Sequence, residues 1–379
     1  MTLSNQAVPI APFGKVIVRD LLPLPRPGIA PESAHREAAV EWLLRAHDAT
    51  PDGGVSYGYS IRGGWRPSYI ETTGYIAVTF YRLAADYGRS SFKPRADRMV
   101  DWLCSVQNRD GSFSNPNYGP GAGIVFDTGQ DLFGLVRSIE EGADVRVKKA
   151  AGNAASWLVE IADPQGRWTR NTHKGIPHVY NSRVAWALLR HNQVEPSADS
   201  VRVARANLDW AVSQQQAGGL YDNCAFEMGK APFTHTIAYA IRGLWEAGEL
   251  LDDDVYRSSA LRASEALLPL VSEDGFLAGQ VDKNGRPAAT YCCLTGNAQL
   301  AIVWAKMHRK LDRSDLKRGA ANVLRYVMAQ QDLNTRDDNR RGAIKGSHPT
   351  WGRYSPLTYP NWATKFFVDA MLECAGWLS

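Results

Sequence analysis

Two acidic residues hold matching places in the sequence and have the chemistry of a catalytic pair. Glu71 opens residues 71–75 (ETTGY) and Asp127 opens residues 127–130 (DTGQ), and an apolar run with helical spacing follows each of them. Two carboxyl groups roughly 5 to 10 Å apart can cleave a glycosidic bond, because one protonates the leaving oxygen and the other activates water or attacks. Neighbouring helices lie about 8 to 10 Å apart, so residues on adjacent helices can meet this condition. Acidic residues in a first turn also simply stabilise the helix, so the sequence leaves both roles open.

A general acid at a helix start needs help to keep its proton. The N-terminus of a helix carries about half a positive charge and favours the ionised carboxylate, which suits a base or a nucleophile. A general acid needs a pKa that burial or a neighbouring negative charge has raised. We expect the repulsion between Glu71 and Asp127 to keep one of them protonated.

His235 and Tyr239 form a second candidate catalytic pair, with a different reaction. The N-terminus of the helix that His235 opens favours the neutral imidazole, and Tyr239 follows one turn later on the same face. The pair could remove and return a proton at C5 of a uronate while Arg183 or Lys365 neutralises the carboxylate. A polysaccharide lyase or a uronyl C5-epimerase is therefore an alternative, although a lone histidine at a helix start is more often structural.

Other aromatic and polar residues near these helix starts are candidates for substrate binding. They are Trp65, Tyr69, Tyr75, Gln130, Tyr180, Arg183, Asn297, Gln299, Lys345, His348, Trp351, Trp362 and Lys365. Aromatic faces suit the C–H groups of a sugar and equally a carbocation in a terpenoid pocket. The many polar residues favour a sugar, and converging helix N-termini favour a negatively charged one. The expected partner is an anionic oligosaccharide or polysaccharide.

The helix starts recur at a regular spacing, which indicates a repeated unit. Comparable openings begin at residues 71, 127, 180, 235, 292 and 361, at intervals of 56, 53, 55, 57 and 69 residues. A second set of helices is predicted over residues 31–49, 92–107, 145–162, 198–216, 254–271 and 314–331. A period near 55 residues is typical of repeated supersecondary units.

Six outer and six inner helices predict a closed all-α ring. Gly-rich turns such as 110–113 (DGSF) follow most outer helices, so each unit is expected to run outer helix, turn, loop, inner helix. Six units bury their inner helices completely only in a ring, because an open stack leaves two apolar edges. The predicted fold is an (α/α)6 toroid over residues 31–379, preceded by an extended arm over residues 1–30. Two long loops, 52–70 and 332–360, lead into inner helices and are expected at the functional mouth.

Composition argues against several classes of function. The 379 residues carry a formal net charge of +4 without a run of five or six basic residues, so no nucleic-acid partner is expected. The absence of an 18-residue apolar stretch and of a signal-peptide core predicts a cytoplasmic protein without a transmembrane segment. Five cysteines without CxxC spacing predict neither a disulfide framework nor a metal site, and no cofactor is expected. The oligomeric state stays open.

Several motifs resemble known toroidal enzymes. Residues 107–113 (QNRDGSF) and their weaker copies resemble the QW-type repeat of terpenoid cyclases and protein prenyltransferases. The six-hairpin arrangement resembles the (α/α)6 glycoside hydrolases, polysaccharide lyases and uronyl epimerases. The acidic and histidine openings, together with 293–299 (CLTGNAQ) and 361–367 (NWATKFF), resemble proteins associated with bacterial exopolysaccharide biosynthesis. The toroid resemblance covers residues 31–378 and implies the fold, whereas one fold hosts many chemistries.

Two departures separate the sequence from terpenoid enzymes. The run nearest to the acid motif of class II cyclases, 252–254 (DDD), follows the end of an inner helix and is expected at the opposite mouth. Cys292 and Cys293 lie near the expected zinc ligand of prenyltransferases, but Thr290 stands where an Asp is needed.

The first hypothesis is a carbohydrate-active enzyme, with hydrolysis slightly preferred over elimination or epimerisation. A terpenoid cyclase or prenyltransferase-like enzyme and a non-catalytic toroid that binds a glycan or an isoprenoid are the alternatives.

Overall fold

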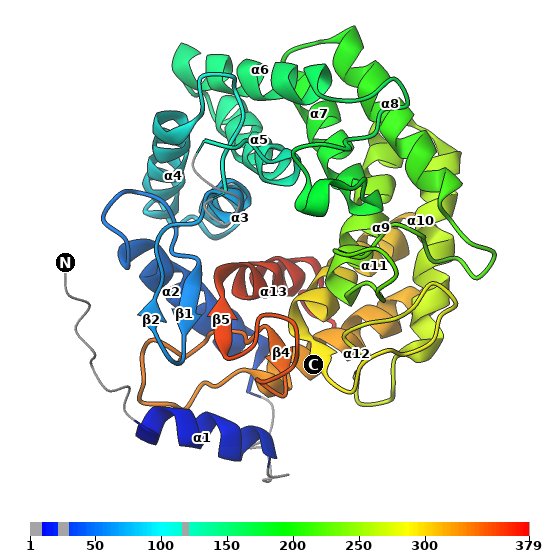
Figure 1. Cartoon of the computed structure of the whole chain (residues 1–379). Helices are drawn as coiled ribbons and strands as arrows, with labels where there is room; N and C mark the ends of the chain where they lie inside the picture. Colours follow the sequence, from blue (N-terminus) through cyan, green and yellow to red (C-terminus); the bar gives the residue numbers. More distant parts are fainter. Residues whose placement is uncertain (1–9, 22–29, 116–120, 379) are drawn as a thin grey trace.

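The structure, a computed structural model, describes residues 10–21, 30–115 and 121–378 (Figure 1). Its inner helices are α3 (Ile70–Tyr87), α5 (Val125–Glu140), α7 (Ser182–Val194), α9 (Thr234–Leu251), α11 (Leu294–Leu311) and α13 (Asn361–Glu373). Its outer helices are α2 (Glu32–Asp48), α4 (Phe92–Val106), α6 (Val145–Glu160), α8 (Ala198–Ser213), α10 (Asp254–Leu267) and α12 (Ser314–Gln330). Each predicted opening lies within two residues of the start of an inner helix. The predicted (α/α)6 toroid is therefore confirmed.

Packing closes the ring and pairs the helices in an order that the sequence analysis did not predict. Neighbouring inner helices contact one another all the way round, and α13 completes the ring against α3. Each outer helix packs mainly on the inner helix before it in the chain, as α4 does on α3, and α2 packs on α13. The predicted order of outer helix before inner helix is wrong for the packed hairpin, because the short connections join an inner helix to the next outer one. The longer connections all run from outer to inner helices and emerge at one mouth.

Burial differs between the two rings as their surroundings require. In α9 every residue from Thr234 to Ile241 is buried, because neighbouring helices cover all sides of an inner helix. In α2 the buried residues follow one stripe that includes Ala39, Leu43 and Ala46 and faces the inner ring. The two patterns explain why inner helices read as almost uniformly apolar after their polar first turn.

Tight turns after the outer helices join neighbouring repeats. Gly111 has a positive φ of 93°, and its Cα faces the carbonyl of Asn153 on α6 so closely that no side chain fits there. Gln107, at the end of α4, donates its amide to the carbonyls of Gly111 and Ala150, both at 2.9 Å. The turn therefore fastens each repeat to the outer helix of the next.

The sixth turn uses the same device and escaped the sequence analysis. Gln331 donates its amide to the carbonyls of Gly342 (2.7 Å) and His35 (3.1 Å), which ties the end of α12 to α2. Eleven positions separate Gln331 from Gly342, whereas four separate the matching residues Gln107 and Gly111. The longer insertion hid the motif.

Short strands connect the two long loops at the mouth. β1 (Gly58–Ser60) lies between β2 (Gly64–Trp65) and β5 (Thr358–Pro360), and all pairs are antiparallel. β3 (Cys292–Cys293) pairs with β4 (Ser347–His348). Short 3-10 helices η2 (His173–Gly175), η3 (Val179–Asn181) and η4 (Leu268–Leu270) complete the described elements. The strands fix the loop before α3 against the loop before α13.

The predicted extended arm is partly helical, which corrects that expectation. α1 (Ile10–Leu21) lies against the outside of the ring, beside the loop that carries β4 (Figure 1). Its Asp20 is buried and contacts Lys345 Nζ (2.5 Å), His348 Nδ1 (3.5 Å) and the backbone N–H of Thr350 (2.7 Å). Residues 1–9 and 22–29 of the predicted arm lie outside the described residues. Within the described ranges no helix is both long and apolar enough to cross a membrane.

Candidate active site

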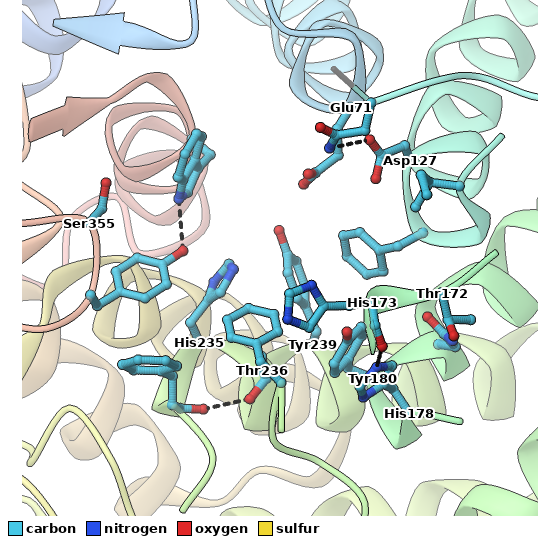
Figure 2. A pocket seen from close by; sticks show the side chains of 18 of the residues that line it. Glu71, Asp127, Thr172, His173, His178, Tyr180, His235, Thr236, Tyr239 and Ser355 are labelled. Atoms are coloured by element: carbon cyan, nitrogen blue, oxygen red, sulfur yellow. Dashed lines mark hydrogen bonds between the residues drawn. The ribbon is translucent and has the colours of Figure 1, made fainter. Parts of the chain in front are cut away.

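A cavity of about 420 Å³ opens at the N-terminal ends of the inner helices (Figure 2). The first turns of α3, α5 and α9 contribute Glu71, Asp127 and His235 to its lining. Tyr180 of η3 and Trp362 of α13 line it as well. The cavity thus brings together residues that are up to 305 positions apart in the chain, as Tyr57 and Trp362 are. Its place agrees with the expectation that the helix openings meet at one mouth.

Glu71 and Asp127 lie at the two ends of one hydrogen-bonded chain. Tyr69 donates its hydroxyl group to Oε2 of Glu71 at 3.0 Å. Asn115 donates its amide group to the Tyr69 oxygen and to Oδ2 of Asp127, both at 2.8 Å. Figure 2 shows the two carboxyl side chains on the same side of the cavity. The predicted pair therefore shares one buried site, as acid–base chemistry at a glycosidic bond requires.

Burial raises the pKa of both carboxyl groups. It raises the pKa of Glu71 to about 7, although the Tyr69 hydroxyl and the Arg183 charge favour the ionised form. Burial and then the charge of Glu71 raise the pKa of Asp127 well above its usual range. The loss of water thus outweighs the helix N-terminus, which would favour ionisation. Burial thus favours the protonated form of both groups, and in Asp127 the charge of Glu71 adds to this effect.

A third carboxyl group, which the sequence analysis did not select, lies one turn further along α5. Asp131 is fully buried against Gly74 of α3, and its carboxyl oxygens lack a well-formed hydrogen bond within the described residues. Burial and then the charges of Asp127 and Glu71 raise its pKa well above the usual range. Burial and the neighbouring carboxyl groups therefore favour the neutral form of Asp131.

His235 presents a neutral imidazole. Its Nδ1 lies 2.8 Å from Oε1 of Gln299, an atom that only accepts, so Nδ1 carries the proton and Nε2 the lone pair. Burial and the positive charge of Arg183 lower its pKa to about 3, against the effect of the Gln299 hydrogen bond. Its ring packs on Tyr239 with centroids 4.4 Å apart. Figure 2 shows the Tyr239 hydroxyl directed toward the side that holds Glu71.

Aromatic rings cover the part of the cavity farther from the carboxyl pair. Tyr180 stacks on His178 with centroids 4.5 Å apart, and its ring meets that of Phe226 at 5.9 Å. Phe226 in turn packs on His173 and Phe233 at 5.3 and 5.8 Å. These rings form a wall suited to the C–H faces of a sugar.

The long loop before α13 forms the rim of the cavity. Trp362 donates its indole N–H to the Tyr354 hydroxyl at 2.8 Å, and Tyr354 packs on His235 at 4.9 Å. Arg353 is exposed and is the one Lys or Arg among the described lining residues. No carboxylate of a described residue pairs with it. Arg353 is therefore positioned to meet an anionic ligand.

Four predicted substrate-binding residues lie beneath the cavity and are buried, which corrects their expected place in its wall. They are Tyr75, Gln130, Arg183 and Lys365. Arg183 donates Nε to Gln130 Oε1 at 2.6 Å and lies over the ring of Tyr239 at 5.0 Å. Lys365 pairs with Asp369 at 2.7 Å. Buried charges need such internal partners, so these residues support the site from below.

The other predicted ligands are occupied elsewhere or lie outside the lining. Lys345 and His348 contact Asp20 of α1, and Asn297 donates its amide to the carbonyl of Gly275 at 3.2 Å. Trp65 donates its indole N–H to Asn339 at 2.9 Å, Trp351 is 42% exposed, and Gln299 supports His235. Tyr69, Tyr180 and Trp362 do line the cavity.

The sequence analysis did not assign several lining residues to substrate binding. They include Tyr57, Asn115, Phe126, His173, Phe226 and Phe233. The length of the loop 52–70 was a signal for Tyr57, whereas nothing local marks the others. Groups of three or more His, Cys, Asp or Glu able to hold a metal ion are not found within the described ranges.

The fold of this chain and its similarity to solved structures define the class of protein. The chain is an (α/α)6 toroid with a cavity at the inner-helix N-termini that combines carboxyl groups with aromatic rings. No protein-family model matches its sequence, and no curated protein does. Solved structures do match in three dimensions. An unsaturated glucuronyl hydrolase from Bacillus sp. GL1 superposes with a TM-score of 0.70 at 16% identity, covering 91% of this chain and 97% of that one.

Two further structures show the range of chemistry on this fold. A variant of the unsaturated glucuronyl hydrolase from Streptococcus agalactiae, in complex with dGlcA-GalNAc6S, has a TM-score of 0.68 at 11% identity and covers 93% of this chain and 97% of that one. D-mannose isomerase has a TM-score of 0.70 at 9% identity and covers 90% of this chain and 96% of that one. At such identities the likeness shows the fold.

Proposed function

We propose that this protein is a glycoside hydrolase that acts on an acidic oligosaccharide. The observation that carries the proposal is the buried pair of Glu71 and Asp127, joined through Tyr69 and Asn115 in one cavity. Their different pKa shifts support different roles, because a general acid must hold a proton at the pH where its partner is ionised. The unsaturated glucuronyl hydrolases of similar fold support the same class of reaction.

In the proposed reaction Asp127 gives its proton to the glycosidic oxygen as the bond to the anomeric carbon breaks. The Glu71 carboxylate takes a proton from the water that attacks this carbon, or attacks the carbon itself and is released by water in a second step. Either route consumes one water molecule and yields two sugars. The Tyr239 hydroxyl, directed toward the Glu71 side, is placed to donate a hydrogen bond to the reacting sugar.

Arg353 supports an anionic substrate. It is exposed at the rim without a carboxylate partner among the described residues, so binding a uronate carboxylate or a sulfate would cost little desolvation. A guanidinium group offers two parallel N–H donors to such a group. The aromatic wall around Tyr180 and Phe226 would hold the apolar face of a sugar ring.

A second candidate function is sugar isomerisation or epimerisation. His235 has a neutral ring whose Nε2 can accept a proton, and Tyr239 is adjacent to it. The similar fold of D-mannose isomerase favours keeping this candidate. Its products would have the same mass as the substrate, which separates it from hydrolysis.

The test is product analysis by mass spectrometry on saturated and unsaturated uronyl oligosaccharides, sulfated and neutral, in heavy-oxygen water. Hydrolysis predicts shorter products that carry one heavy oxygen, lost in Glu71→Gln and Asp127→Asn and kept in the surface control Asp199→Asn. Products of unchanged mass that gain deuterium from heavy water would favour His235 and Tyr239. No turnover of any glycan would refute the proposal, and turnover of a prenyl diphosphate would replace it with the terpenoid alternative.

A further inference from the structure

Asn115 contacts both halves of the carboxyl pair through a single atom. Its Nδ2 lies 2.8 Å from the Tyr69 hydroxyl oxygen and 2.8 Å from Oδ2 of Asp127. An amide nitrogen carries two hydrogens and accepts none, so both contacts are donations from Asn115. Tyr69 can then give its own hydrogen to Oε2 of Glu71. The direction of every hydrogen bond in the chain follows from this one amide.

A hydrogen-bonded turn leads directly into Asn115. Asn108 donates its amide to the hydroxyl groups of Ser112 (2.9 Å) and Ser114 (2.8 Å), and the backbone N–H of Phe113 binds the Thr128 hydroxyl at 2.9 Å. Asn115 itself is buried, with 3% of its surface exposed. Its amide is therefore oriented before any ligand enters.

The two donations leave one defined oxygen on each carboxyl group. Oδ2 of Asp127 accepts a hydrogen from Asn115, so a proton on this carboxyl group belongs on Oδ1. Oε2 of Glu71 accepts the Tyr69 hydrogen, so Oε1 is the oxygen left to receive a proton or to attack. We propose that Asn115 is a positioning residue that selects Oδ1 of Asp127 as the proton donor and, through Tyr69, Oε1 of Glu71 as the proton acceptor. The roles of proton donor and proton acceptor rest on the proposed hydrolase function, whereas the hydrogen bonds that single out the two oxygens do not.

Other titratable groups surround the pair and must be accounted for. Tyr57, Asp131, Arg183 and Tyr239 interact electrostatically with Glu71 from neighbouring elements, and Tyr75 does so from the same helix, α3. On α13, which packs on α3, Lys365 is paired with Asp369. None of these groups donates a hydrogen to Oδ2 of Asp127 or Oε2 of Glu71 within the described residues. Their influence is common to the wild type and to the variants below.

The test measures the titration of Glu71 and Asp127 in the substrate-free protein, by NMR of carbon-13-labelled carboxyl groups. Signals are assigned with Glu71→Gln and Asp127→Asn. Asn115→Ala removes the donor to Asp127 and weakens the Tyr69 hydrogen bond to Glu71, so both titrations should move up by about one pH unit. Tyr69→Phe removes only the donor to Glu71, so only the titration at the lower pH, which is that of Glu71, should move.

Asn207→Ala is the matched control, because Asn207 is a buried asparagine whose amide binds the Gly166 carbonyl at 2.8 Å, away from the site. It should leave both titrations unchanged. Unchanged titrations in Asn115→Ala, or an unchanged Glu71 titration in Tyr69→Phe, would overturn the inference. If Asn115→Ala does not fold, the Tyr69→Phe result decides.

Kinetics separate this inference from the proposed function. Where a glycan is cleaved, the lower limb of the kcat/KM pH profile should move up in Asn115→Ala and in Tyr69→Phe, whereas a merely structural role lowers the rate equally at every pH. Shifted titrations without cleavage of any glycan would uphold the role of Asn115 and refute the hydrolase. Cleavage of a glycan with unshifted titrations would uphold the hydrolase and refute the role of Asn115.

Discussion

Replacing Glu71 with Gln should stabilise the folded protein, and it should do so only when the pH is high enough to ionise Glu71. The folded protein holds the proton on Glu71 up to a pKa of about 7, whereas the model value for an exposed Glu is 4.5. Between these two values the unfolded chain has lost the proton and the folded chain still binds it. Stability therefore falls as the pH rises through this window.

The size of the effect follows from the same two values. A difference of about 2.5 pKa units corresponds to roughly 3 kcal/mol, which is an upper value because Glu71 keeps some contact with solvent. Gln has nearly the same shape, can accept the Tyr69 hydrogen and stays neutral at every pH. Glu71→Gln should thus match the wild type near pH 4.5 and exceed its free energy of unfolding by about 3 kcal/mol at pH 8.

Equilibrium unfolding in urea at several pH values measures this difference. The matched control is Glu246→Gln, since Glu246 is buried between Arg242 (3.2 Å) and Lys306 (3.3 Å), and their charges hold its pKa low despite burial. The control should lose about 2 to 4 kcal/mol at pH 8, because two cations lose their partner. A Glu71→Gln protein that is less stable than the wild type at pH 8, or equally changed at both pH values, would refute the reasoning.

Three further outcomes are expected. Asp20→Asn should remove the negative charge that contacts the buried Lys345 ammonium and cost about 3 kcal/mol of α1 docking, seen as faster hydrogen exchange in α1, while Asp199→Asn on the surface changes little. Because the pKa of Asp20 is lowered to about 2 from 3.8, this stabilisation is complete above pH 3.8 and is lost as the pH falls through 2. Gly74→Ala should lower the melting temperature and cost about 2 kcal/mol, because its Cβ would overlap the α5 backbone. Arg353→Gln should raise KM for an acidic glycan by about tenfold with kcat unchanged, and unchanged kinetics would exclude this contact.

The fold was predictable because its signal is local and repeated. Helical periodicity over 10 to 18 residues, polar first turns and Gly-rich turns recur about every 55 residues, and each occurs within a single stretch of chain. The packing partners were less accessible. Helical spacing shows that α2 has an apolar stripe, but it does not show that the stripe packs on α13 at the other end of the chain.

The candidate site shows the same division. Glu71, Asp127 and His235 could be selected because they open inner helices, and helices of one ring place their first turns at one mouth. Arg183 and Lys365 occupy similar positions in their helices, yet they are buried beneath the cavity and satisfied by Gln130 and Asp369. First-turn position alone does not tell a lining side chain from one turned into the barrel.

By itself the sequence determined the number of helices in the ring, where each lies along the chain and the mouth at which chemistry-bearing residues gather, since these follow from periodicity and helix polarity along the chain. Only the tertiary structure decided which residues meet. Asn115 reaches the carboxyl pair because a turn and the bridge between Ser114 and Gly123 bring this loop residue against two helices. Lys345 lies away from the mouth because it pairs with Asp20 of α1. The physical reason is that hydrogen bonds and buried ion pairs depend on contacts between distant segments, which the spacing of residues does not record.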